Sequence, residues 1–182
     1  RLIVTCRYHA ILLASILKER GIPVRVRYGF AHYLYPGYHV YHAICEVWNE
    51  KEQRWMLVDP DRQLVDFPRE QFESAADAWL KYQKGEVDPS TYGVPGWVGA
   101  HPILSALCYD LAAVLGSELV DGYYPPVVRD TEVYDTGKPN EKRETITKLA
   151  ILLQDPDKNF RELKRFYDKH EFIQFYQRQS GS

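Results

Sequence analysis

The sequence predicts an α+β fold, in which one helix packs on an antiparallel β-sheet and a largely helical C-terminal half covers or flanks the cleft. Three observations support this class. Apolar residues recur at helical three- and four-residue spacing over residues 6–20. Apolar and polar residues then alternate, as strands require, over 24–30, 41–48 and 54–58. Helical spacing returns in much of the chain beyond Asp59.

The first helix is predicted over residues 6–20, and Gly21 supplies a typical stop signal. Thr5 is placed to cap it, with the hydroxyl accepting a hydrogen bond from a free backbone N–H of the first turn. Cys6 would then lie at the positive end of the helix dipole. That position favours a thiolate over a thiol.

The first strand, 24–30, is expected to be half-buried because its apolar and polar residues alternate. The other two strands should form a hairpin through the polar turn 49–53. In an extended strand His42 and Cys45 point to opposite faces. In the plausible registers Asp59 lies on the His42 face, opposite or diagonal to the imidazole.

Beyond the hairpin, residues 67–84, 101–116, 140–154 and 156–169 are predicted to be helical. Asp155 is the expected N-cap of the last helix, with Pro156 at its first position. Residues 89–99 are rich in turn residues and aromatics. We therefore expect a catalytic core in 1–66 and a mainly helical extension in 67–179, packed together as one domain.

Composition narrows the function classes. The 182 residues suit one globular domain, and the net charge of −2 offers no basic surplus, so nucleic acid is not an expected partner. No apolar run approaches the roughly 20 residues that cross a bilayer, so no membrane partner is expected either. Three cysteines make no disulfide framework, which fits a soluble protein in the reducing cytoplasm. Because the sequence starts with Arg1 and not with an initiator Met, we expect an upstream part of the core to be missing.

Cys6, His42 and Asp59 together suggest a thiol site. Taken singly, each has an ordinary structural explanation: a small buried thiol, a core histidine and a strand-ending turn. Their joint occurrence favours chemistry, because a helix-start Cys, a strand His and a next-strand Asp occur in an order that lets them converge. In such a site the carboxylate orients one imidazole nitrogen while the other faces the thiol.

Three segments resemble the transglutaminase-like superfamily. The stretch from Thr5 through Arg25 resembles its nucleophile helix and following strand, 42–48 resembles its His strand, and 55–60 its Asp strand. The resemblance implies a papain-like core with Cys6 as nucleophile, His42 as general base and acid, and Asp59 as orienting group. It also implies acyl transfer through a thioester.

Two departures limit what the resemblance transfers. No long side chain precedes Cys6 to stabilise an oxyanion, so that role falls to the Cys6 backbone N–H and an unknown partner. No acidic loop with a turning Gly is present to bind calcium, which favours hydrolysis of a peptide or other amide over protein crosslinking. The alternatives are an inactive module that binds a protein or peptide partner, or a site that a missing upstream segment completes.

Weaker substrate-binding candidates are Arg7, Tyr41, Glu46 and Trp48. A first-turn arginine is usually solvated, and Glu46 has an alternative structural role as an ion-pair partner of Arg25 or Arg27. A cluster of tyrosines precedes the His strand and could line a cleft, although ordinary packing is the favoured explanation. Its members are Tyr33, Tyr35, Tyr38 and Tyr41.

A zinc site is the main competing hypothesis. His39, His42 and Cys45 follow the spacing H-x-x-H-x-x-C, and His32 could be a fourth ligand. Strand parity opposes it, because His39 and Cys45 point one way and His42 the other. Neither a metal nor a cofactor is therefore expected.

Overall fold

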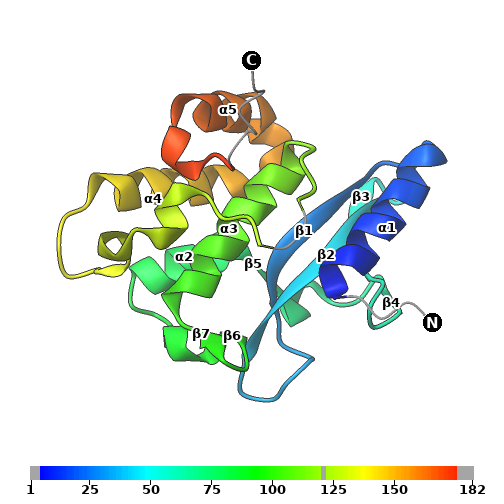
Figure 1. The fold of residues 1–182 in the computed structure, drawn as a ribbon. Helices are drawn as coiled ribbons and strands as arrows, with labels where there is room; N and C mark the ends of the chain where they lie inside the picture. The colour runs from blue at the N-terminus through cyan, green and yellow to red at the C-terminus, as the bar shows by residue number, and fades with distance from the viewer. Residues whose placement is uncertain (1–4, 120–121, 176–182) are drawn as a thin grey trace.

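The computed structural model describes residues 5–119 and 122–175 (Figure 1). Its helices are α1 (Cys6–Glu19), α2 (Ala75–Gln83), α3 (Ala100–Val114), α4 (Glu141–Leu153) and α5 (Pro156–Lys169). Its strands are β1 (Val24–Ala31), β2 (His39–Asn49), β3 (Arg54–Asp59), β4 (Leu64–Val65), β5 (Phe72–Ser74), β6 (Tyr92–Val94) and β7 (Trp97–Val98). Short 3₁₀ turns lie at Arg69–Gln71, Pro89–Thr91, Pro126–Arg129, Thr131–Tyr134 and Glu171–Ile173. The α+β class is therefore confirmed.

The sheet has the order β4-β3-β2-β1-β5, with β6 pairing in parallel with the start of β2 and β7 pairing with β6. In Figure 1, α1 lies at the right of the sheet, while α2 to α5 gather at the left and top. The main core joins these helices to one face of β1 and β2, and the Cys45 thiol there donates to the Ala10 carbonyl, 3.2 Å away. A smaller cluster of Ile44, Leu57 and Phe67 lies apart from this core.

Helix boundaries follow local signals closely. Thr5 occupies the N-cap position of α1, but its side chain makes no capping hydrogen bond, so that detail of the prediction is wrong. Gly21, with φ of 72°, follows the helix in the left-handed conformation that glycine adopts most readily. Asp155 caps α5 as predicted, accepting from the backbone N–H of Lys158, and Pro156 is the first helical residue.

Strand β1 corrects one expectation, because it is almost entirely buried and not half-buried. Arg27 points into the protein, where its guanidinium pairs with Asp110 of α3 and with Glu46 of β2. The backbone N–H of Tyr28 also donates to Asp110, at 2.9 Å. Charged residues in the alternating pattern therefore face a buried polar layer in place of solvent.

The predicted helix over 67–84 is also corrected. It begins only at Ala75, after the Ser74 side chain accepts a hydrogen bond from the Asp77 backbone N–H. The preceding residues, Phe72–Ser74, form β5 and pair with the end of β1. These residues form a strand because they can pair with the open edge of β1. The spacing of apolar residues in the sequence gives no information about that pairing. The turn-rich segment 89–99 likewise contains two short strands, β6 and β7.

No helix in the described parts of the chain combines the length and apolar character needed to cross a bilayer.

Replacing Gly29 with alanine is expected to destabilise the fold by about 1–3 kcal/mol, the usual cost of overpacking. A Cβ at this position would collide with the backbone carbonyl oxygen of Glu73, because β5 passes directly over Gly29. Urea unfolding measures the change. Gly137→Ala, at an exposed loop position, is the matched control and should change stability by less than about 0.5 kcal/mol. Equal stability of the two variants would mean that β5 can shift without cost.

Candidate active site

Cys6 is the first residue of α1 and the most accessible thiol of the chain. It is partly exposed, whereas Cys45 and Cys108 are buried, and all three are free cysteines. Burial raises the pKa of the Cys45 thiol to about 12 and also raises that of Cys108. The two buried thiols are thus held in their unreactive form. Helix geometry leaves the backbone N–H of Cys6 without an intrahelical acceptor, so it can bind an anion.

His42 lies between Cys6 and Asp59. Its Nε2 is 2.8 Å from Oδ2 of Asp59, and the nearby Cys6 side chain also influences its pKa. Because Nε2 is engaged by the carboxylate, Nδ1 is the nitrogen left to face a thiol. Burial acts to lower the pKa of His42, but the contacts with Asp59 and Cys6 outweigh it and raise the pKa to about 9.

Strand register explains how Asp59 reaches His42. The β2–β3 ladder pairs Cys45 with Val58, which puts Asp59 level with Ile44 and one step diagonal from His42. Asp59 is the last residue of β3, so its side chain is free to turn towards the imidazole. The diagonal arrangement is one of the two that side-chain parity allows.

The Asp59 carboxylate is fully buried and fixed on both oxygens. Oδ1 accepts from the backbone N–H groups of Asp61 and Arg62, at 2.9 and 3.1 Å. Oδ2 accepts from His42 and from the hydroxyl of Tyr33, which is 2.5 Å away. Burial opposes ionisation, yet these hydrogen bonds, that of His42 foremost, lower the pKa of Asp59. The group is therefore an ionised carboxylate held in one orientation.

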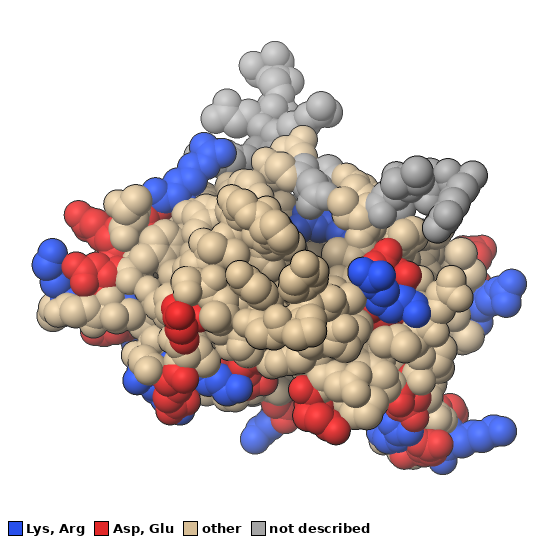
Figure 2. Space-filling model, turned by 90° about the horizontal axis from the view of Figure 1, so that it is seen from below, with Lys and Arg blue, Asp and Glu red and all other residues tan. Residues whose placement is uncertain are grey.

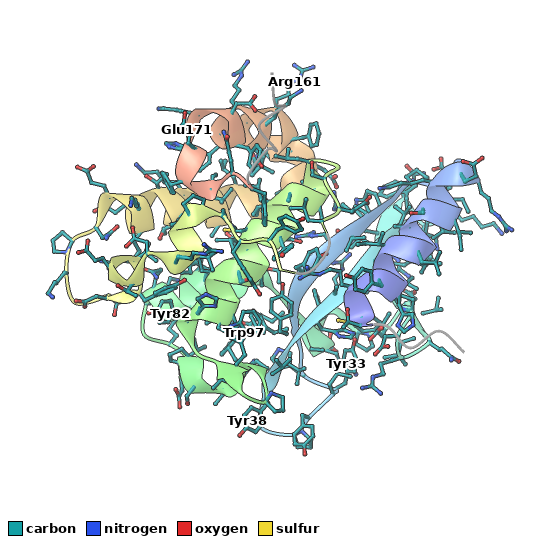
Figure 3. The ribbon with its side chains drawn as sticks, in the orientation of Figure 1. Tyr33, Tyr38, Tyr82, Trp97, Arg161 and Glu171 are labelled. Atoms are coloured by element: carbon teal, nitrogen blue, oxygen red, sulfur yellow. The ribbon has the colours of Figure 1, made fainter. Side chains whose placement is uncertain are left out.

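Tyr33 and His9 support this arrangement from outside the predicted residues. Figure 3 shows Tyr33 below the first turn of α1, in the loop that joins β1 to β2. Burial and the bond to Asp59 raise the pKa of its phenol, so Tyr33 remains a donor. Nδ1 of His9 lies 2.9 Å from Asp61 and ties α1 to the turn after β3. The cluster of tyrosines in this loop is the sequence feature that could have indicated a role for Tyr33. No sequence pattern indicates the contact made by His9.

Arg7 and Tyr41 lie next to the thiol, but both are largely covered. The Arg7 side chain is only 5% exposed, so the expectation of a solvated arginine is wrong. Its guanidinium lies 3.9 Å from the centre of the Tyr109 ring and donates to the Tyr41 hydroxyl at 3.2 Å. This cation–π contact anchors the first turn of α1 against α3. The position suits support of the site better than direct substrate contact.

Glu46 and Trp48 lie further along β2 than His42. They follow His42 by four and six residues, about 13 and 20 Å along a strand. The Glu46 carboxylate is occupied by Arg25 and Arg27, at 2.7 and 2.8 Å, as the structural alternative predicted. Trp48 packs against the neighbouring Trp55 ring. These contacts are structural ones, and a role of Glu46 and Trp48 in substrate binding stays a prediction.

The four clustered tyrosines divide into two pairs. Tyr33 and Tyr41 are engaged as described above, whereas Tyr35 and Tyr38 are exposed and line a hollow of about 480 Å³. Arg62 also lines it and connects it to the turn after Asp59. Figure 2, the view from below, shows a face whose centre is mainly uncharged, with charged side chains towards its edge.

The H-x-x-H-x-x-C trio does not converge. His42 bonds Asp59, while the Cys45 thiol bonds the Ala10 carbonyl in the main core. Strand parity therefore predicted the outcome correctly. His39 instead lies beside His32, with ring centres 4.6 Å apart.

Comparison with known families agrees with this geometry. The family model of the transglutaminase-like superfamily matches residues 4–60, which supports the resemblance found in the sequence motifs. The matched segment includes α1 and the strands that carry His42 and Asp59. At the level of that superfamily, the match supports cysteine-dependent acyl transfer. Searches of curated proteins and of solved structures found no match.

Proposed function

We propose that the chain is a thiol hydrolase that cleaves a peptide or related amide through a thioester on Cys6, with His42 and Asp59 completing a catalytic triad. The observation that carries the proposal is the bond between His42 Nε2 and the buried carboxylate of Asp59, which leaves the other ring nitrogen for the helix-start thiol. A papain-like core, with the cysteine on a helix and the histidine on the sheet, fits the same arrangement.

The raised pKa of His42 suits a resting imidazolium beside a thiolate. The sulfur of Cys6 attacks the carbonyl carbon, and the carbonyl electrons move to oxygen, where the Cys6 backbone N–H is placed to stabilise them. His42 then gives its proton to the leaving amine as the C–N bond breaks. Asp59 keeps the ring aligned throughout.

Water completes the cycle. Neutral His42 removes a proton from water, the hydroxide attacks the thioester, and the thiolate leaves as the imidazolium is regenerated. An amine in place of water would give transfer instead of hydrolysis. The hollow lined by Tyr35, Tyr38 and Arg62 is the candidate place for an uncharged substrate segment.

The decisive measurement is the rate of iodoacetamide alkylation of Cys6 at pH 6, followed by mass spectrometry. An ordinary thiol, with a reference pKa of ~8.5, has well under 1% thiolate at this pH, so a thiolate paired with His42 should react at least tenfold faster. The unfolded wild-type chain provides the reference rate. His42→Ala should remove the advantage, whereas the control His170→Ala, on the C-terminal side of α5, should keep it.

If folded Cys6 reacts no faster than the unfolded chain, the hydrolase proposal is wrong. Slow reaction would favour the alternative, in which the triad residues are structural and the module binds a peptide or protein partner. A fast reaction that survives His42→Ala would assign the activation to the helix start alone and would also contradict the proposed role of His42.

A further inference from the structure

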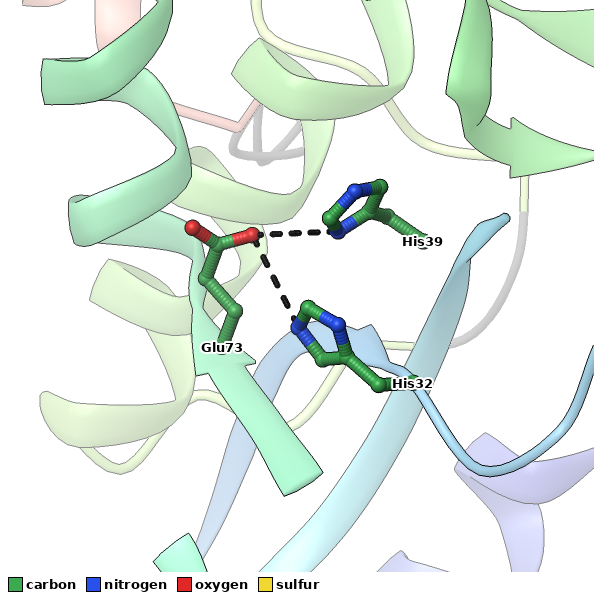
Figure 4. A group of neighbouring side chains, drawn as sticks. All are labelled: His32, His39 and Glu73. Atoms are coloured by element: carbon green, nitrogen blue, oxygen red, sulfur yellow. Dashed lines mark ion pairs between the residues drawn. The ribbon is translucent and has the colours of Figure 1, made fainter. Parts of the chain in front are cut away.

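A second group of polar side chains lies outside the thiol site. His32 directly follows β1, His39 is the first residue of β2, and Glu73 is the middle residue of β5. One nitrogen from each imidazole and one oxygen of the carboxylate all lie within 4.8 Å of one another. Figure 4 shows both rings directed at the same carboxylate oxygen. Three segments far apart in sequence thus bring together two imidazoles and one carboxylate.

The separations match those around a small metal ion. Nδ1 of His39 is 3.5 Å from Oε2 of Glu73, and Nε2 of His32 is 4.0 Å from the same oxygen. Two ligands bound to zinc at their usual lengths, in tetrahedral geometry, lie about 3.3 Å apart. Side-chain rotation at the exposed His32 is enough to close the remaining distance.

The ring of His39 is held in a fixed orientation beside Glu73. It stacks on Tyr92, with centres 4.1 Å apart and planes 4° apart, which fixes the direction of Nδ1. Nδ1 is buried and lies 3.5 Å from Oε2 of Glu73, but the contact lacks the geometry of a hydrogen bond. A metal ion bound between the two atoms would give this buried nitrogen a partner.

Glu73 has the supporting contacts that ligating carboxylates usually have. The Tyr92 hydroxyl donates to Oε2 at 2.8 Å, and Lys81 donates to Oε1 at 2.7 Å. Lys81 thereby leaves Oε2 as the single ligand atom of this carboxylate. Backbone pairing with Phe30 holds the residue in the sheet. A hollow of about 650 Å³, lined in part by His32 and Glu73, gives an ion access from solvent.

We propose that His32, His39 and Glu73 bind one divalent transition-metal ion, with zinc as the ion best suited to two imidazoles and a carboxylate. His39 and Glu73 form the inner wall of the site and the exposed His32 its outer wall, so water completes the coordination shell. Because His32 and His39 flank the loop between β1 and β2, a bound ion would fasten both ends of that loop to β5. This site is independent of the proposed hydrolase activity.

The test is calorimetric titration of the metal-free chain with zinc chloride. It should be done in a Cys6→Ala background, because a thiolate beside a histidine also binds zinc. We expect one ion per chain, with the affinity reduced at least tenfold by His32→Ala and by His39→Ala. His170→Ala, a histidine outside the cluster, is the matched control and should leave the affinity unchanged.

A second variant separates ligand loss from misfolding. Tyr92→Phe removes only the hydroxyl that supports Glu73 and should weaken zinc binding about 10- to 100-fold. Circular dichroism of each variant checks that the fold is kept, and His32 is exposed enough to be replaced safely. The proposal is overturned if the Cys6→Ala protein shows no saturable zinc binding, or if the His32 and His39 variants bind as well as the His170 variant.

Discussion

In an Asp59→Asn variant, the pKa of His42 is expected to fall by more than one unit from its wild-type value of about 9. Burial of the ring lowers that pKa and would persist in the variant. The hydrogen bond with Asp59 is the largest single influence that raises it, and the variant loses this bond together with the carboxylate charge. The influence of Cys6 remains, so the loss is partial. Titration of the His42 ring protons by NMR measures it directly.

Asp61→Asn is the matched control, because Asp61 bonds His9 and does not contact the His42 ring. It should leave the pKa of His42 close to its wild-type value. If Asp59→Asn also left that pKa near 9, the carboxylate would not be the group that holds the imidazolium.

The same shift gives the wild-type protein a pH-dependent stability. Since the pKa of His42 is raised by folding, its contribution is fully present below about pH 6.5 and is lost as the pH rises towards 9. A shift of this size corresponds to about 3 kcal/mol in the free energy of unfolding. In Asp59→Asn this pH dependence should shrink, because the pKa of His42 lies closer to its value in the unfolded chain. Urea unfolding of both proteins at pH 6 and pH 9 tests the reduction.

Arg27→Met should destabilise the fold by about 3–5 kcal/mol, the usual cost of removing one partner of a buried ion pair. Nε and Nη2 of Arg27 bond the two oxygens of Asp110 at 2.9 and 3.0 Å, and Nη1 bonds Glu46 at 2.8 Å. Asp110 is fully buried. Burial disfavours the ionised form of Glu46, yet Arg27 and Arg25 lower the pKa of Glu46 to about 2. Without Arg27, Asp110 loses both guanidinium bonds.

Two further variants make this prediction specific. Arg161→Met, at an exposed position of α5, should change stability by less than about 0.5 kcal/mol. Adding Asp110→Asn to Arg27→Met should recover part of the loss, because it neutralises the unpaired carboxylate. A loss below 1 kcal/mol for Arg27→Met, measured by urea unfolding, would show that water or local rearrangement compensates the buried charges.

Features set by short-range pattern could be predicted from the sequence. The period of apolar residues located α1, α3, α4 and α5, and the alternation in the β2–β3 hairpin placed His42 and Asp59 on one face. Both depend only on residues that are neighbours along the chain or across one tight turn. The candidate site was accessible to sequence reasoning for the same reason, because its three residues lie within the first 59.

Features set by distant partners could not be predicted. Arg27 and Asp110 are 83 residues apart, and nothing local to either indicates the other. Strand β5 forms because β1 has an open edge, although its own three residues fit a helical pattern. Tyr33 reaches Asp59 from a loop whose path depends on the assembled sheet. In each case the interaction depends on tertiary structure, which side-chain periodicity does not encode.

Because the three cysteines differ in burial, the number of reactive thiols reports how much of the protein is folded. A thiol reagent added to the native protein should find one reactive group, Cys6, since Cys45 and Cys108 are enclosed. After denaturation it should find three. The ratio of the two counts reports the fraction of correctly folded molecules in any preparation, without an introduced label and before any substrate is known.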